Sequence, residues 1–172
     1  TSSFSPTTFP TDAATALTIT GTNFGIDHAT NAVSATYQNA ALSNLAGALY
    51  DATGCAVSVA HTQIVCTSEA NGVGHALNWK VTVGDQQSSA SSATTTYTGP
   101  AITGLSGLSS FETDGSDTDL VTITGTNFGV VDIDNEAIAV YQNSALSSTY
   151  ASGEFTAREC IVSVAHTEMT CK

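Results

Sequence analysis

The sequence predicts an all-β protein built from two tandem β-sandwiches, the second of which lacks its C-terminal strands. The first observation behind this prediction is that LTITGTNFG, residues 17–25, recurs almost unchanged as VTITGTNFG, residues 121–129. The second is that apolar residues alternate with threonines in both copies, which is the period of a half-buried strand. No segment has convincing helical periodicity. Self-similarity this close indicates a tandem repeat.

Copy one spans residues 1–99, and its segments read as short strands separated by turns. It opens with the extended Ser/Thr/Pro-rich stretch 1–10, and the repeated strand with its glycine-containing turn follows. Further strands are expected at residues 33–39, 56–59, 63–66, 76–83 and 91–98. In one of them, four alternating residues are expected to face a core: Leu77, Trp79, Val81 and Val83. Some seven short strands at this spacing are typical of a sandwich.

Copy two spans residues 100–172 and matches copy one at offsets of 104 and 105. The tripeptide YQN at Tyr141 repeats that at Tyr37, and SVAHT at 163–167 repeats 58–62. Nothing in copy two corresponds to residues 67–98, which hold the four core residues of the predicted strand. Their burial would contribute about 6–12 kcal/mol, comparable to the stability of a small domain. We therefore expect an open sheet edge in copy two that another strand must fill.

The composition restricts the partners of the chain. Three Lys and Arg stand against 15 Asp and Glu, which gives a net charge of -12. Nucleic acid is excluded as a partner because phosphate binding needs clustered basic residues, and the same argument disfavours anionic membrane surfaces. No apolar run is long enough for membrane insertion. Polarity comes instead from 48 serines and threonines, a composition typical of exported proteins that carry O-glycans.

The four cysteines support an extracellular location. Cys55 and Cys66 are 11 residues apart, as are Cys160 and Cys171. Four cysteines allow three pairings, and the repeat favours one disulfide in each copy. Each would contribute about 3 kcal/mol in the chain-entropy model. The rival interpretation is a zinc site, but the Cys-x-x-Cys or His spacing that zinc requires is absent.

No residues are assigned to catalysis, and no cofactor is expected. His61 and His166 occupy equivalent positions between paired strands, and the nucleophile and carboxylate of a catalytic triad cannot be assigned beside them. We interpret them as turn residues and the protein as a non-enzyme. Calcium candidates are the closely spaced carboxylates Asp114, Asp117 and Asp119, although their spacing is not that of an EF-hand. The competing interpretation is a solvated acidic loop.

A second hydroxyl-rich stretch supplies candidates for covalent O-glycans. These are Ser88, Ser89, Ser91, Ser92, Thr94, Thr95 and Thr96. The alternative is a polar loop that leads into an exposed strand.

The repeated residues resemble the IPT/TIG domain, an immunoglobulin-like module of plexins and transcription factors. The family pattern I-x-G-x-x-F-G is present at residues 19–25 and 123–129, and an S-P-T opening stands at 5–7. A V-x-V strand and a Cys…I-x-C strand pair also match. The resemblance covers copy one and about two thirds of copy two, and implies two tandem immunoglobulin-like sandwiches. Family members in transcription factors bind DNA through basic loops, which are absent here, whereas those in ectodomains act as spacers, adhesive modules or dimerisation units.

The leading hypothesis is an extracellular structural protein whose subunits join end to end into a homopolymeric filament or surface appendage. Residues 1–10, with Phe4 and Phe9, are the candidate donor strand for the open edge of copy two. The first alternative is a fragment of a multi-IPT adhesin or receptor ectodomain that binds a protein or glycan partner. The second is an accessory domain of a secreted carbohydrate enzyme, although no catalytic carboxylate pair can be assigned.

Overall fold

A computed structural model describes residues 3–28, 31–39, 49–107, 120–131, 137–142 and 154–172. Those residues form fifteen strands and no helix, which confirms the all-β prediction. The chain divides into two compact units, Thr1–Gly99 and Pro100–Lys172, which we call unit 1 and unit 2.

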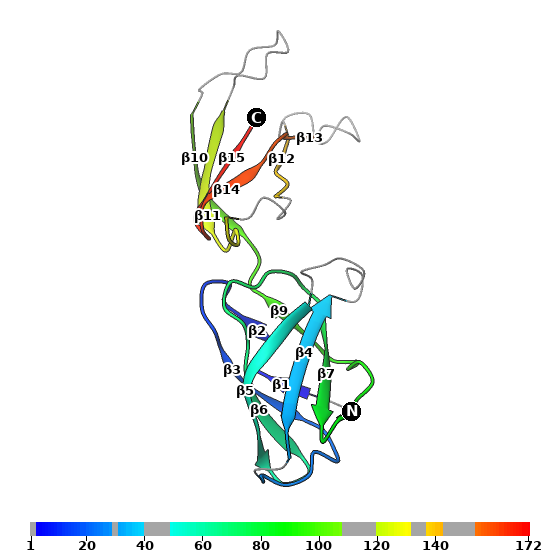
Figure 1. Cartoon of the computed structure of the whole chain (residues 1–172). Coiled ribbons are helices and arrows are strands. Elements are labelled where there is room, and N and C mark those ends of the chain that lie inside the picture. Colours follow the sequence, from blue (N-terminus) through cyan, green and yellow to red (C-terminus); the bar gives the residue numbers. More distant parts are fainter. Residues whose placement is uncertain (1–2, 29–30, 40–48, 108–119, 132–136, 143–153) are drawn as a thin grey trace. The chain divides into compact units, whose positions relative to one another are not determined.

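Unit 1 is a sandwich whose two layers share one long strand. Its strands are β1 (Ser3–Ser5), β2 (Thr8–Phe9), β3 (Ala16–Thr20), β4 (Val33–Asn39), β5 (Leu49–Val59), β6 (Gln63–Thr67), β7 (Leu77–Val83), β8 (Gln86–Gln87) and β9 (Thr94–Tyr97). The first layer has the order β1-β3-β6-β5 and the second β5-β4-β7-β9, with β2 beside β9 and β8 beside β7. Figure 1 shows β4 between β5 and β7. The first half of β5 pairs with β4 and its second half with β6. A bulge between Thr53 and Ala56 lies where the strand changes layers, as expected because bulges bend strands.

The core of unit 1 lies between these layers and follows the alternation in the sequence. Leu77, Trp79 and Val81 of β7 are buried, and Val83 at the end of the strand is half-buried. From the opposite layer, the Phe4 ring of β1 approaches the Trp79 ring with a centroid distance of 5.5 Å. The inward orientation predicted for β7 is therefore confirmed.

The N-terminal stretch belongs to unit 1 itself, which corrects its assignment as a donor strand. Phe4 lies opposite Ile19 in the β1–β3 pair, and β2 places Phe9 beside Tyr97 of β9. Both phenylalanine side chains are buried, and Phe9 is fully so. They are unavailable to a neighbouring subunit without loss of the core. An extended, aromatic-bearing segment has the same sequence pattern whether it completes its own sandwich or another one.

Unit 2 repeats part of this architecture. Its strands are β10 (Ala101–Gly107), β11 (Val121–Thr126), β12 (Val140–Gln142), β13 (Glu154–Thr156), β14 (Ile161–Val164) and β15 (Glu168–Cys171). The order β10-β11-β15-β14 corresponds to the first layer of unit 1, and the β12–β13 ribbon corresponds to β4 and the first half of β5. The registers also correspond, because Ile123 lies opposite Met169 as Ile19 lies opposite Ile64. No described strand of unit 2 corresponds to β7 or β9.

Candidate functional site

The two repeated motifs contact each other in unit 1. The turn at residues 21–25, which we call the signature turn, lies against the histidine turn at residues 59–62. The His61 N–H donates to the Gly25 carbonyl oxygen at 2.6 Å, and the Phe24 N–H donates to the His61 carbonyl oxygen at 3.2 Å. A third bond joins the Gly21 N–H to the Thr62 carbonyl oxygen at 3.0 Å. Each turn thus supplies hydrogen-bond partners to backbone groups of the other turn.

Unit 2 makes the same three bonds at the equivalent residues. The His166 N–H donates to Gly129 at 2.6 Å, the Phe128 N–H to His166 at 3.2 Å, and the Gly125 N–H to Thr167 at 2.9 Å. The backbone of His166, like that of His61, has a positive φ of about 64–65°. Both histidines are therefore turn residues fixed by backbone hydrogen bonds, as the sequence predicts.

Glycines are required at both ends of the signature turn. A Cβ on Gly21 would lie 2.5 Å from Cζ of the Phe24 ring, which covers the glycine. A Cβ on Gly125 would meet the equivalent ring at 2.4 Å and a backbone oxygen at 2.1 Å. Gly25 and Gly129 have φ angles of 74° and 84°, in the left-handed region that other residues avoid. The I-x-G-x-x-F-G pattern thus encodes a close ring–backbone contact followed by a left-handed turn.

A closed hydrogen-bond ring joins two buried tyrosines to the backbone of Glu69. The Glu69 N–H donates to the Tyr37 hydroxyl at 2.8 Å, and the Tyr97 hydroxyl donates to the Glu69 carbonyl oxygen at 2.7 Å. The two hydroxyls are 2.6 Å apart, and Tyr37 donates because the Tyr97 proton is already engaged. Burial raises the pKa of both hydroxyls above the ordinary value. Both hydroxyls therefore stay protonated at neutral pH, and their role here is to hold the core together through hydrogen bonds.

Trp79 lies at the centre of the same aromatic cluster. Its ring stacks on Tyr37 with a centroid distance of 4.2 Å and an interplanar angle of 16°. The indole N–H donates to the Thr95 hydroxyl oxygen at 2.9 Å. Both residues are 1% exposed, so this bond is fully shielded from water. Trp79 is a core residue, in agreement with the sequence-based interpretation.

A cavity of about 320 Å³ opens beside this cluster in unit 1. Its apolar side includes Phe4, Phe24 and Trp79, and its polar side is the segment 88–92 with its serine hydroxyls. None of its lining residues carries a charged side chain. The cavity therefore offers apolar contact and hydroxyl groups, but no general acid, general base or metal ligand.

The hydroxyl-rich segment is partly internal, which corrects one of the glycan assignments. Thr95 is buried and cannot carry a glycan in the folded unit. Three further hydroxyl oxygens accept backbone N–H bonds: Ser88 from Val81, Ser91 from Trp79, and Thr96 from Ala76. The exposed members of the predicted set with no hydroxyl hydrogen bond to the described residues are Ser89, Ser92 and Thr94.

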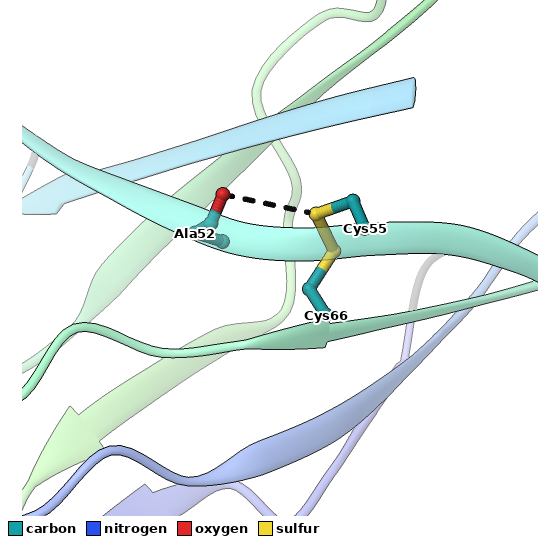
Figure 2. The surroundings of a disulfide bond; sticks show 3 residues. All are labelled: Ala52, Cys55 and Cys66. Atoms are coloured by element: carbon teal, nitrogen blue, oxygen red, sulfur yellow. Dashed lines mark hydrogen bonds between the residues drawn. A yellow bond between two sulfur atoms is a disulfide. The ribbon is translucent and has the colours of Figure 1, made fainter. Parts of the chain in front are cut away.

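Both predicted disulfides are present, one in each unit. Cys55 of β5 bonds to Cys66 of β6, and Cys160 bonds to Cys171. Figure 2 shows that the first disulfide joins neighbouring strands. The Cys55 Sγ atom lies 3.9 Å from the Ala52 carbonyl oxygen. We regard this approach as a packing contact, because a disulfide sulfur carries no proton to donate. The disulfides fix the β5–β6 pair and its counterpart in unit 2.

The predicted calcium site is not tested by the described residues. The calcium candidates Asp114, Asp117 and Asp119 lie outside the described residues. Within the described ranges no group of three or more His, Cys, Asp or Glu side chains could hold a metal ion. The described part of the chain also contains no helix with the length and hydropathy to cross a membrane.

An exposed ring pair distinguishes unit 2 from unit 1. Tyr141 of β12 stacks on Phe155 of β13 with a centroid distance of 5.4 Å and an interplanar angle of 23°. The two side chains are 57% and 55% exposed. Tyr37 and Tyr50 form the equivalent pair in unit 1, at 5.2 Å and 28°, but there Tyr37 is fully buried. Unit 2 thus presents to solvent a ring pair that unit 1 keeps in its core.

Comparison with protein families gives one result. The sequence model of the IPT/TIG domain matches residues 1–98, which is more than half of the 172-residue chain. The match covers unit 1, so an IPT/TIG domain in unit 2 stays a prediction from the repeat. Comparisons with curated proteins and with solved structures find no match.

Proposed function

The chain belongs to the IPT/TIG domain family, and from this premise we propose that it is a non-enzymatic structural module of an extracellular or cell-surface protein. The observation that carries the proposal is the duplicated construction of the two units. Each repeated motif has a structural role in both: the signature turn, the histidine turn and the disulfide. Two successive units with the same internal bracing suit an array of rigid spacers or adhesive modules.

The chemistry of the chain supports the extracellular part of this proposal. Disulfides persist in oxidising compartments and are rare in the cytosol. No free cysteine is present. The surface of unit 1 is rich in hydroxyls and poor in lysine, and the net charge of -12 leaves no basic surface for DNA. These properties favour the receptor and adhesin branch of the family over the transcription-factor branch.

Two measurements on the native protein test this proposal. Antibodies against unit 1 should label intact, unpermeabilised cells or the culture medium. Mass spectrometry should show that the peptides that hold the four cysteines are joined in pairs before reduction. Labelling only after permeabilisation, together with reduced cysteines, would contradict an extracellular role.

A second candidate function is self-association of subunits into a filament or appendage. The exposed Tyr141–Phe155 ring pair favours it, because adjoining exposed apolar side chains are a feature of protein–protein contact surfaces. Phe4 and Phe9 are not available as donor side chains, since both are buried in the core of unit 1. Sedimentation of the 172-residue chain over a range of concentrations tests this candidate. Oligomers that dissociate when both rings are replaced by serine would support it, and a monomer at all concentrations would argue against it.

A further inference from the structure

The cavity of about 320 Å³ in unit 1 is bounded by both layers of the sandwich. The first layer contributes Phe4 and Ile19, together with the signature turn that follows β3, and the second contributes Trp79 and Val81 of β7. All four of these side chains are buried, so the apolar wall of the cavity is the core of unit 1 itself. The volume lies at the lower end of the range of roughly 300–1,000 Å³ that is usual for small-molecule sites.

The polar wall of the cavity is the segment 88–92, which we call the serine wall, and it is fixed on β7 at two points. At the first, the Ser88 N–H donates to the Val81 carbonyl oxygen at 2.8 Å, and the Val81 N–H donates to the Ser88 hydroxyl oxygen at 3.0 Å. At the second, Ser91 and Trp79 make the same two bonds, both at 2.9 Å. The serine wall is therefore held in place without a ligand, which lowers the entropy cost of binding one.

Three further hydroxyls line the cavity and are available to a ligand. The two anchoring serines donate their hydroxyl protons to nearby backbone carbonyl oxygens, so those protons are engaged. Thr22, Ser89 and Ser92 also line the cavity, are exposed, and make no side-chain hydrogen bond to the described residues. Each of their hydroxyls can donate one hydrogen bond and accept two. The cavity thus combines an apolar floor with a rim of hydroxyls that can both donate and accept.

Charge and polarity restrict the class of ligand that this cavity fits. No lining residue carries a charged side chain, so an anionic ligand would find no cation and a cationic ligand no carboxylate. A wholly apolar ligand would leave the rim hydroxyls without partners. The ligand that fits is neutral, with an apolar face and several hydroxyls at its edge. A pyranose sugar has this division, because C–H groups cover its ring faces and hydroxyls surround the ring.

We propose that the cavity is a binding site for one neutral hexopyranose unit. The C–H groups of the sugar ring face Phe4 and Phe24, and its hydroxyls exchange hydrogen bonds with Thr22, Ser89 and Ser92. The exposed rim leaves room for further sugars of a glycan to extend into solvent. This inference goes beyond the structural role proposed above, because it gives unit 1 a ligand of stated chemistry.

The first test is an NMR titration of the full 172-residue chain, isotopically labelled and shown by its intact mass to carry no glycan. The probes are the methyl glycosides of glucose, galactose and mannose. At least one should shift the Trp79 indole signal, which is unique in the chain, and the amide signals of the serine wall. The shifts should saturate in the millimolar range, as expected for so small a ligand. No saturable shift with any of the three glycosides would overturn the proposal.

Two further probes test the chemistry of recognition. Cyclohexanol has a ring of similar size with a single hydroxyl, and glucuronic acid adds a negative charge to the sugar. Both should bind at least tenfold more weakly than the best glycoside, because the first leaves rim hydroxyls unpaired and the second brings a carboxylate to a site without a cation. Cyclohexanol or glucuronic acid that binds as tightly as the glycosides would overturn the assignment of a neutral sugar.

Paired serine substitutions test whether the rim hydroxyls bind the sugar. The double variant Ser89→Ala and Ser92→Ala should weaken binding of the best glycoside at least tenfold, because it removes two hydrogen-bonding groups. The matched control is Ser34→Ala with Ser58→Ala, since these serines are equally exposed but do not line the cavity. Thermal melting should show that both double variants are folded. Equal binding by the two variants would overturn the placement of the sugar at the serine wall.

The native protein identifies the source of the sugar. If peptide mapping finds a glycan on Ser89 or Ser92, the chain supplies its own sugar, and enzymatic removal of that glycan should restore binding of the free glycoside. If neither serine carries a glycan, the native protein should bind the glycoside directly. A native protein that binds no glycoside in either state would overturn the proposal. The test of extracellular location uses antibodies and cysteine-containing peptides only, so failure of the sugar proposal is distinguishable from failure of the proposed function.

Discussion

The buried hydrogen bond between Trp79 and Thr95 can be measured by a double-mutant cycle. Thr95→Val keeps the shape of the side chain but leaves the indole N–H without a partner in a site that is 1% exposed. An orphaned buried polar group costs about 1–3 kcal/mol, so we expect that loss in the free energy of unfolding. Trp79→Phe orphans the Thr95 hydroxyl and also removes ring volume, which gives an expected loss of about 2–4 kcal/mol.

The double variant removes both polar groups and leaves neither unpaired. Its loss should therefore be smaller than the sum of the two single losses by about 1–2 kcal/mol. Urea unfolding of the full chain with intact disulfides measures these values by far-UV circular dichroism, because Trp79→Phe removes the only tryptophan. The unit 1 transition is first identified in the original chain by Trp79 fluorescence.

Thr94→Val is the matched control, since Thr94 neighbours Thr95 in β9 but is exposed. Its effect should stay within about 0.5 kcal/mol. Additive single losses in the cycle, or an equal effect of the Thr94 and Thr95 substitutions, would refute the assignment of the buried bond.

Four further predictions concern unit 1. Replacement of both its cysteines by alanine should lower its stability by about 3 kcal/mol, measured as the urea midpoint; an unchanged midpoint would contradict the bracing role of the disulfide. Above pH 10 the free energy of unfolding of unit 1 should fall by up to about 2.7 kcal/mol per pH unit, because Tyr37 and Tyr97 keep protons in the folded state that the unfolded chain releases. Unfolding curves at pH 9 to 11 measure this slope, and a flat profile would contradict the prediction. Gly25→Ala should lower the free energy of unfolding by about 1–2 kcal/mol, and Gly25→Asn should lower it less, since asparagine tolerates the left-handed region. Thermal melting compares the two variants, and equal losses would argue against the φ constraint. O-glycans found by peptide mapping should be confined, within the predicted set, to Ser89, Ser92 and Thr94.

The strands of unit 1 could be predicted because short-range alternation in the sequence matches their burial. Residues 33–39 and 77–83 form strands with the expected inward faces, since alternation is sufficient when one face of a strand is buried. The disulfides could be predicted because the repeat placed each cysteine pair at the same spacing. The histidine turns were predictable for the same reason.

Long-range partners could not be predicted from these patterns. The sequence does not indicate that Thr95 would turn inward to meet the Trp79 indole, because β9 contains three successive threonines and a register shift of one residue would reverse which of them is buried. Nor does it predict the Tyr37–Tyr97 bond, which joins residues 60 positions apart. The structure also explains Gly72, since any Cβ there would lie 2.1 Å from Cζ of the Tyr97 ring, but a glycine in the sequence does not identify the ring that packs on it. The donor assignment of Phe4 and Phe9 was wrong because the local pattern does not say whose core a strand completes.

The pairing of β2 with β9 has a mechanical consequence. These are the second and the last strands of unit 1, they run parallel, and they are joined by bonds from the Thr96 N–H to the Thr7 carbonyl oxygen and from the Thr98 N–H to the Phe9 carbonyl oxygen. Tension that pulls the two ends of unit 1 apart along the strands slides β2 and β9 past each other and loads both bonds together, whereas strands peeled from one end would break them in turn. In addition, the Cys55–Cys66 disulfide keeps the chain between these two cysteines from extending even if the two layers of unit 1 separate. Under such a load, the β2–β9 pair would oppose extension of unit 1, and the disulfide would limit its length once the strands separate.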